Sequence, residues 1–244
     1  MQLYRVAELF HAAGNRSRKF HLTIMATIYE VHPDTPQPRR IEEIRDALDQ
    51  GAVMLYPTDT VYAIGCGIHV KSAVQRVRQI KQLSNDKPLT FLCPSLSNIA
   101  SYAQVSDPAY RIMKRLIPGP FTFLLPATKQ VPKLVMSPKR KTTGIRVPDR
   151  PVCLALLDAL QVPIISTSAY LLDKEHSTPI PTLEVGQTLD KAELFDRWEK
   201  LVDLIIDDGS EPGYEMSTIL DLTDANYPEI VRQGLNWETA AAWI

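Results

Sequence analysis

The apolar positions along the chain recur with two periods, which predicts helices and strands that alternate. Between residues 38 and 50, Ile41, Ile44 and Leu48 fall on one helical face, and Gly51 follows as a stop signal. The same reasoning predicts further helices at 71–81, 106–117 and 151–160. Short apolar runs predict strands at 52–55, 89–93, 121–125, 162–167, 202–207, 217–222 and 229–232. Alternation of this kind is typical of an α/β or α+β domain.

The first 24 residues differ from the rest in their charge and pattern. They carry one acid, Glu8, against four cations, Arg5, Arg16, Arg18 and Lys19. No continuous apolar run follows the cations, so the segment is not a secretory signal. An ordinary helix stays open, because residues 3–10 have apolar positions at helical spacing. We expect an N-terminal extension at 1–24 and a single domain at 25–244, and Met25 is an alternative start.

Composition narrows the class of protein. The chain has 244 residues, of which 45% are hydrophobic, and a mean hydropathy of -0.12. That suffices for a large core, whereas no apolar run approaches the roughly 20 residues that span a bilayer. Cys66, Cys93 and Cys153 stand far apart without a CxxC pair, which indicates neither a zinc site nor a disulfide framework. We therefore expect no membrane association, and the cytoplasm as the location.

The net charge of -1 conceals two halves of opposite sign. Residues 1–172 hold 22 Lys and Arg against 12 Asp and Glu, and the remaining residues hold 5 against 16. Cations are densest between residues 129 and 150, which suits nucleotide phosphates or an RNA backbone; a solvated loop is the open alternative for the outer lysines. Arg146 differs, because apolar neighbours surround it. Its fork of donors predicts a carboxylate or phosphate partner.

Polar groups follow the strand expected at 52–55. The chain turns at Pro57 and then presents Thr58, Asp59 and Thr60. We expect these side chains at the mouth of a cleft, where their oxygens can hold a small polar ligand; a turn capped by the same side chains is an equal alternative. Ser166 and Ser168 alternate along another expected strand, so they share one of its sides.

Several common motifs are missing. The sequence contains no GxxxxGK[ST], no complete dinucleotide fingerprint, no GxSxG and no HExxH. What remains is a set of hydroxyl, lysine and arginine groups suited to positioning anions: Thr58, Thr60, Lys81, Lys87, Thr122, Thr142, Thr143, Arg146, Ser166, Thr167, Ser168, Ser217, Thr218 and Arg232.

Eight ordered blocks give the chain a resemblance to a known family. They begin at Pro57, Lys87, Pro118, Gly144, Ser166, Val202, Ser217 and Val231. In this order they resemble the YrdC-like proteins over residues 30–236. The resemblance implies a twisted, open mixed α/β sheet with helices around a large, concave, basic cavity. Members of the TsaC type make threonylcarbamoyl-adenylate from threonine, bicarbonate and ATP, with release of pyrophosphate, for tRNA modification. Other members are described as binding double-stranded RNA.

The resemblance also implies roles for individual residues. Contacts to the substrate threonine would come from Thr58, Thr60, Arg146, Ser166, Ser217 and Thr218. The nucleotide side would be lined by Lys87, Thr142, Ser168 and Arg232, and the catalytic groups would be Lys81, Arg146 and Ser168. Magnesium would come with ATP, held by phosphates and water rather than by a protein cage. Ordinary roles stay open, namely strand threonines for Thr122 and Thr142 and a helix-end cation for Lys81.

The chain departs from the TsaC pattern at three positions. Leu83 stands where those enzymes carry an arginine, Tyr170 replaces an asparagine, and Leu92 aligns with a histidine that touches threonine. A lost charge-assisted contact is typically worth about 1.5–3 kcal/mol. The pattern most resembles the YciO branch, and two hypotheses stay open: a synthase of reduced rate, or a protein that binds RNA or a nucleotide without efficient turnover. The loop at 171–187 is the candidate lid.

Overall fold

The structure, a computed structural model, describes residues 25–84, 87–170 and 190–244. The extension expected at 1–24 and the candidate lid at 171–187 lie outside these residues. The helices within the described part are α1 (Pro38–Asp49), α2 (Lys71–Ile80), α3 (Leu96–Tyr102), α4 (Asp107–Leu116), α5 (Pro151–Leu160), α6 (Lys191–Trp198) and α7 (Trp237–Ala241). The strands there are β1 (Thr27–Glu30), β2 (Met54–Tyr56), β3 (Ala63–Gly67), β4 (Thr90–Leu92), β5 (Phe121–Pro126), β6 (Thr142–Arg146), β7 (Ile164–Ser168), β8 (Leu204–Asp207), β9 (Thr218–Asp221) and β10 (Glu229–Arg232).

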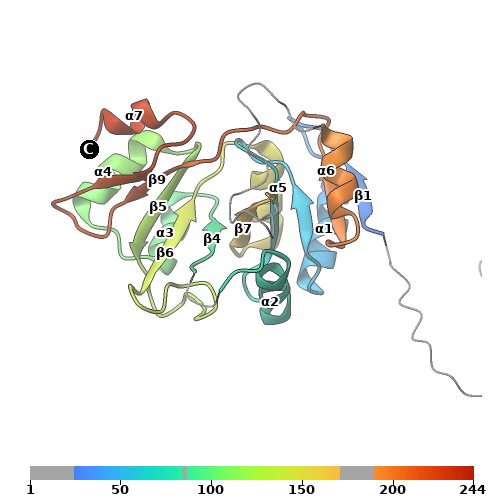
Figure 1. Ribbon diagram of the computed structural model, residues 1–244, viewed down its shortest axis with the longest axis horizontal. Coiled ribbons are helices and arrows are strands. Elements are labelled where there is room, and N and C mark those ends of the chain that lie inside the picture. The colour runs from blue at the N-terminus through green and yellow to red at the C-terminus, as the bar shows by residue number, and fades with distance from the viewer. Residues whose placement is uncertain (1–24, 85–86, 171–189) are drawn as a thin grey trace, which may run out of the picture.

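The strands form one open mixed sheet, which confirms the expected fold class. Its order is β1-β8-β2-β3-β7-β4-β6-β5-β9-β10. Parallel pairs join β1 to β8, β8 to β2, β4 to β6 and β5 to β9, whereas the other neighbours are antiparallel. After β8 the chain crosses from one end of the sheet to the other before it enters β9 (Figure 1).

The predicted elements agree with the structure to within two residues at each end. Helix α5 and strand β10 have the expected bounds. Helix α4 begins as its sequence indicates, because the Ser106 side chain accepts a hydrogen bond from the Ala109 amide. Strands β1 and β3 and helices α3, α6 and α7 were not expected, and β6 was anticipated only as a strand-like segment near Arg146.

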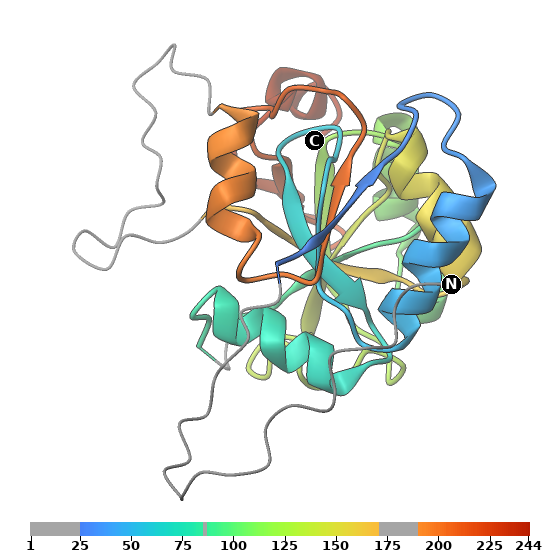
Figure 2. The same ribbon diagram turned by 90° about the vertical axis from the view of Figure 1, so that its right-hand side faces the viewer.

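Helices cover the two faces of the sheet differently. We call the face that carries Met54 and Ile164 the first face; α1 and α5 pack on it, in one apolar cluster with β8, β2 and β7. The second face carries Leu55 and Ile165, and α2, α3, α4 and α6 contribute to its larger cluster. Figure 2 shows α1 and α5 on one side of the sheet, with α2 and α6 on the other.

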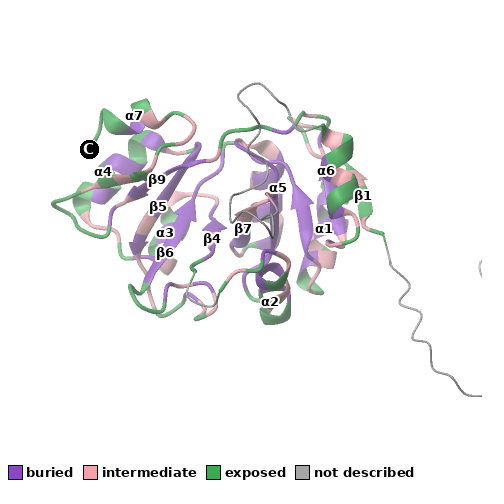
Figure 3. Cartoon of the chain, viewed as in Figure 1, coloured by how far each residue is buried: buried purple, intermediate pink, exposed green. Residues whose placement is uncertain are grey.

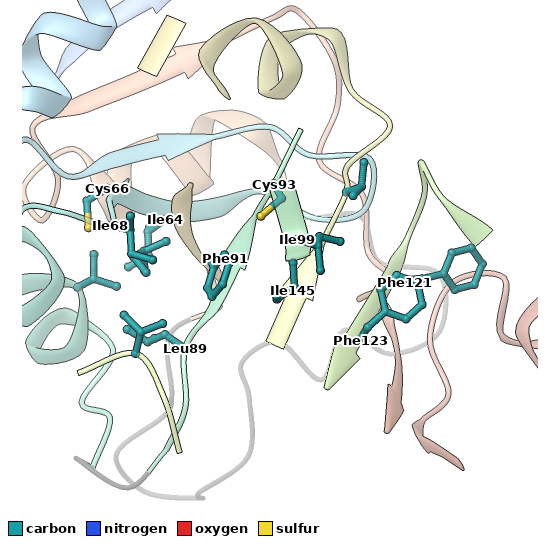
Figure 4. Packing of buried hydrophobic residues seen from close by; sticks show 14 of the residues in the cluster. Ile64, Cys66, Ile68, Leu89, Phe91, Cys93, Ile99, Phe121, Phe123 and Ile145 are labelled. Carbon is teal, nitrogen blue, oxygen red and sulfur yellow. The ribbon is translucent and has the colours of Figure 1, made fainter. Parts of the chain in front are cut away.

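The second face supplies most of the core. Figure 4 shows Leu89, Phe91, Ile145 and Phe123 from neighbouring strands packed in a row with Ile99 of α3. The central strands are buried, while the helices are buried on their inner sides only (Figure 3). All three cysteines are buried and unpaired. Within the described ranges no helix has the length and apolar character needed to cross a membrane.

One end of the first face lacks this apolar cover. Among the described residues, the cluster under α1 and α5 includes none from β6, β5, β9 or β10. In those strands the positions on the first face carry polar groups instead, including Thr122, Arg146, Ser217 and Arg232. The uncovered half of the first face is therefore where a polar ligand can meet the sheet.

Candidate functional site

A cavity of about 190 Å³ lies on the uncovered half of the first face. Side chains at alternate strand positions build it, because residues two apart share a face of a strand. Leu92 and Arg146 are partners in the β4–β6 register, and Thr90 pairs with both Gly144 and Ser166. The lining consists of Thr58, Thr60, Val61, Ala63, Leu83, Lys87, Pro88, Leu89, Thr90, Leu92, Thr122, Arg146, Ser166, Thr167, Ser168, Met216, Ser217, Ile219 and Arg232.

Arg146 is buried at the floor of this cavity and is held on three sides. Its Nη1 donates to Thr60 Oγ1 at 2.9 Å, and its Nε donates to the Gly119 carbonyl at 3.2 Å. Its Nη2 lies 2.6 Å from Oδ1 of Asp59, an ion pair in which both partners are almost fully buried. Among the described residues the carboxylate oxygens of Asp59 have no hydrogen-bond partner, and there the ion pair with Arg146 neutralises this acid.

Features of the capped turn and of the cleft mouth occur together at Thr58 and Thr60. Thr58 Oγ1 donates to the Val61 carbonyl at 2.6 Å and lies 3.0 Å from Thr60 Oγ1. Thr58 therefore closes the turn after β2, while both threonines also line the cavity. The hydroxyl of Thr60 is thereby aimed at Arg146.

Ser166 and Ser168 share the cavity side of β7, which confirms the predicted alternation. Ser166 Oγ accepts a hydrogen bond of 2.7 Å from the Tyr56 hydroxyl, and burial raises the pKa of that phenol far above its usual value. Gly65 makes room for this ring, because a Cβ there would lie 3.0 Å from Tyr56 Cε1 and 2.3 Å from the Ile165 carbonyl oxygen. Tyr56, a member of the apolar cluster on the first face, thus fixes the Ser166 hydroxyl.

Arg232 brings a second guanidinium to the cavity. Its Nε and Nη2 donate to the Ser217 carbonyl at 3.0 and 2.7 Å, and Nη2 also donates to Ser217 Oγ at 3.0 Å. That hydroxyl lies 2.9 Å from Thr122 Oγ1. Burial lowers the pKa of Arg232, and the positive charge of Arg146 lowers it further. Two arginines that repel each other across a cavity favour an anion between them.

Lys81 lies behind the cavity wall rather than in its lining. Its Nζ donates to the carbonyls of Ser168, at 2.9 Å, and of Tyr170. Burial lowers its pKa to about 8. Lys81 is not a solvated helix-end cation, since only 7% of its surface is exposed. It fixes the carboxyl end of β7 by holding the carbonyl of its last residue, Ser168, and that of Tyr170 two residues further on.

Thr142 and Thr218 were expected at the site, but the structure places neither in the cavity lining. Thr218 is on the second face, where its Oγ1 donates to the Leu235 carbonyl and accepts from the Gly234 amide. Ser217 lines the cavity from the position before β9, whereas the Thr218 hydroxyl bonds the segment near Leu235 instead. Thr142 begins β6, four residues from Arg146, opposite Pro126. Thr142 shares the side of β6 that carries Arg146 but lies at the other end of the strand, outside the lining.

The three departures from the TsaC pattern fall at or near the cavity. Leu83 and Leu92 line it. Leu92 also packs in the cluster under α1 and α5, and Leu83 packs against the core of the second face. Tyr170 is outside the lining, and its hydroxyl donates to the Tyr214 carbonyl at 3.1 Å. Two apolar side chains therefore occupy the wall where the resemblance implies cationic or imidazole groups.

The charge of the lining has one sign. Among the described residues, it contains Lys87, Arg146 and Arg232 and no carboxylate. Within the part of the chain that the structure describes, no group of three or more His, Cys, Asp or Glu side chains is placed to bind a metal ion. A divalent cation in this cavity would thus need oxygen ligands from an anionic ligand and water.

The basic stretch at 129–150 separates into two parts. Lys129, Lys133, Lys139 and Lys141 are exposed in the connection between β5 and β6. Arg146 and the neighbouring Arg150 are in ion pairs, and Arg150 binds Asp208 Oδ2 through Nε at 2.8 Å and Nη2 at 2.5 Å. Arg146 and Arg150 are thus part of the interior, while the four lysines and Arg140 are exposed to solvent.

Fold and cavity together define a class of protein, an open mixed α/β sheet with a basic cavity on one face. The family model described as "Sua5_yciO_yrdC: Telomere recombination" matches residues 46–234, and the chain belongs to this Sua5/YciO/YrdC family. The resemblance expected from the sequence is thereby confirmed.

Individual relatives sharpen this result. YciO of Escherichia coli (strain K12) is 41% identical over 211 residues, covering 86% of this chain and 97% of YciO; its crystal structure matches with a TM-score of 0.75. The human threonylcarbamoyl-AMP synthase is 30% identical over 80% of this chain and 67% of its own length. The crystal structure of P. abyssi Sua5 complexed with L-threonine matches with a TM-score of 0.76 at 25% identity, over 90% of this chain and 61% of Sua5.

Some residues at the site were not assigned a role from the sequence. Thr90 lies two positions before Leu92 in β4, so alternation would have placed it in the cavity once Leu92 was placed there. Asp59 was seen only as part of the polar turn. Its pairing with Arg146 joins residues 87 apart in the sequence, and no local pattern indicates such a contact.

Proposed function

We propose that this cavity binds ATP together with the carboxylate of a small amino acid such as threonine, and that the chain forms a threonylcarbamoyl-adenylate or a close analogue of it. The observation that carries the proposal is the lining itself, whose described residues include three cations, no carboxylate and eight threonine or serine hydroxyls. Such a surface stabilises anions and aligns them without supplying a covalent nucleophile.

The reaction forms two bonds, C–N and O–P, and breaks two, the C–O bond of the departing water and a P–O bond of ATP. The threonine amine adds to the carbon of bicarbonate with loss of water, and a carbamate oxygen then attacks the α-phosphorus of ATP. The bond from this phosphorus to the bridging oxygen breaks, and pyrophosphate leaves. Both reactants are anions, so the dominant requirement is neutralisation of charge at close range.

The residues divide between the two anions. Arg146, with Thr60, Ser166 and Ser217 near it, is suited to the amino-acid carboxylate. Lys87 and Arg232 are suited to phosphate oxygens, with Ser168 between the two groups. Magnesium arrives with ATP and keeps phosphate and water ligands, since the lining offers no carboxylate. Lys81 acts in this scheme on the carbonyls of Ser168 and Tyr170, which fix the adjoining wall.

The relatives support this proposal in general terms. A threonylcarbamoyl-AMP synthase is among the proteins that match most of the chain, and P. abyssi Sua5 is complexed with L-threonine. Neither the use of bicarbonate nor the modification of tRNA follows from these matches, and both belong to the proposal.

A second candidate function is binding of a nucleotide or RNA without efficient turnover. Leu83 and Leu92 favour it, because they replace groups that the synthase pattern uses at the cavity. The exposed lysines between β5 and β6 add a surface suited to a phosphate backbone. RNA affinity that falls steeply with added salt, without dependence on threonine, would favour this second function.

The decisive experiment is pyrophosphate release from Mg-ATP, measured with and without threonine and bicarbonate. It compares the wild type with the double variant Leu83→Arg, Tyr170→Asn. We expect release from the wild type that requires both co-substrates, and faster release from the variant. If only the variant releases pyrophosphate, the scaffold is retained and the second function replaces the first. If neither does, the proposed reaction is wrong.

A further inference from the structure

Arg78 on α2 is a buried arginine outside the cavity lining. It is 5% exposed, and its guanidinium holds backbone carbonyls from two loops. Nε donates to the Leu134 carbonyl at 3.0 Å, Nη1 to the Ser84 carbonyl at 3.0 Å and Nη2 to the Lys87 carbonyl at 2.6 Å. A planar fork of this kind can hold three carbonyls at once, which the point charge of a lysine cannot do.

The first of these loops leaves α2 and enters the cavity. The helix ends in a Schellman motif, in which the Leu83 amide bonds the Arg78 carbonyl at 2.9 Å and the Gln82 amide bonds the Gln79 carbonyl at 3.0 Å. Gln82 takes the left-handed conformation that this motif requires, with φ of 50°. The loop thereby brings Leu83, and after it Lys87, to the cavity wall.

Backbone bonds near Lys87 fix the same loop at its far end. The Lys87 amide donates to the Ser84 carbonyl at 3.1 Å, and the Leu89 amide donates to the Val135 carbonyl at 2.9 Å. Arg78 joins the two attachments, since it bonds Ser84, Lys87 and Leu134 together. The position of the Lys87 backbone relative to the sheet is therefore set in large part by one side chain that no ligand touches.

We propose that Arg78 is a positioning residue for Lys87, and through it for the anion side of the cavity. The ammonium of a lysine sits on a long flexible stem, so its mean position depends on where the backbone is held. The inference rests on the proposed function for its ligand, Mg-ATP. The effect of Arg78 on the order of the loop can nevertheless be measured without any ligand.

The first measurement is hydrogen exchange of the ligand-free protein, read on peptides that cover residues 82–91. The variant is Arg78→Met, and the matched control is Arg76→Met on the same helix. Arg76 bonds Asp203 Oδ2 at 2.5 Å and the Leu201 carbonyl at 3.0 Å, away from this loop. We expect exchange at 82–91 to accelerate at least tenfold in Arg78→Met and to stay unchanged in Arg76→Met. Arg78→Lys, which keeps the charge without the fork, serves if the methionine variant does not fold.

The second measurement is calorimetric titration of Mg-ATP into the wild type, Arg78→Met, Lys87→Ala and the double variant. If Arg78 acts through Lys87, each single change lowers the affinity about tenfold and the double change lowers it no further. If the double variant loses affinity by the product of the two single losses, Arg78 has a purely structural role. The same conclusion follows if Arg78→Met, measured below its melting temperature, binds Mg-ATP as tightly as the wild type. Unchanged exchange at 82–91 overturns the inference outright. If the wild type binds no ATP, the proposed function fails and the exchange result alone decides the role of Arg78.

Discussion

The two halves of the first face of the sheet share the same strand geometry but differ in their side chains, which are apolar and covered in one half and polar and uncovered in the other. Under α1 and α5, alternate positions such as Met54, Ile164 and Leu204 are apolar and close-packed. Beyond β7, the equivalent positions carry Thr90, Arg146 and other polar groups that helices of the described chain leave uncovered. The second face shows no such division, because its apolar cluster includes residues from β2 to β9.

On this one surface, the covered half mainly stabilises the fold, and the uncovered half is suited to binding a ligand. The covered half gains free energy from burial of apolar area, typically about 25 cal/mol per Å². The uncovered half holds a buried ion pair and two opposed arginines, which cost desolvation and favour an anionic ligand. Variants in the two halves should therefore separate loss of stability from loss of binding.

The largest effect is expected from Arg146→Ala. Removing the guanidinium takes away the carboxylate clamp, so threonine-dependent turnover should fall at least a hundredfold, as expected for about 3 kcal/mol of lost charge-assisted bonds. It also leaves Asp59 buried and uncompensated, which should destabilise the fold by about 3–5 kcal/mol. The double variant Arg146→Ala, Asp59→Asn should recover most of that stability but no turnover, as measured by urea unfolding and pyrophosphate release. Recovery of both would contradict the division between the halves.

Leu156→Ala tests the covered half. Leu156 is completely buried between α5 and the sheet, and its truncation should cost about 2–5 kcal/mol in unfolding free energy. Affinity for Mg-ATP, measured well below the melting temperature, should stay within about twofold of the wild type because the cavity is untouched. A large loss of affinity without further unfolding would show that the two halves are coupled.

Lys81, at the end of α2, holds the end of β7 and should make stability depend on pH. Its pKa is lowered to about 8 from 10.5 by burial. Between these values the unfolded chain binds the proton and the folded chain does not, so stability rises with pH in this window. The rise can reach about 3 kcal/mol. Urea unfolding at pH 7.5 and 10 should show this gain in the wild type relative to Lys81→Met; equal changes in the two proteins would mean that the ammonium is not desolvated.

The smallest effect is expected from Gln82→Gly. Gln82 holds a left-handed conformation, which costs an ordinary residue about 1 kcal/mol and glycine nothing. Thermal unfolding should therefore show a gain of about 0.5–1 kcal/mol. A loss of stability would indicate that the Gln82 side chain contributes contacts that outweigh the backbone strain.

The sequence was informative wherever periodicity was strong. The apolar spacing of α1 and α5 and the alternation of Ser166 and Ser168 were read correctly. Strand β3 was missed because Gly65 and Gly67 look like turn residues, whereas Gly65 is required by the close approach of Tyr56 and Ile165.

The site was predictable in outline but not in detail. Eight of the residues expected there line the cavity, namely Thr58, Thr60, Lys87, Arg146, Ser166, Ser168, Ser217 and Arg232. Thr218 lies outside the lining, because a motif of adjacent residues does not say which one faces the cavity. Lys81 and Arg78 act through backbone carbonyls of distant segments, and such contacts leave no trace in residue type or spacing.

The most direct test of the central claim is a titration of Mg-ATP into the wild type, Arg232→Met and Arg76→Met. Both variants remove one arginine, but only Arg232 lies in the cavity. We predict micromolar or tighter binding by the wild type, a loss of at least tenfold in Arg232→Met, and no change in Arg76→Met. Equal affinity in all three proteins would contradict the assignment of the uncovered half of the sheet as the nucleotide site.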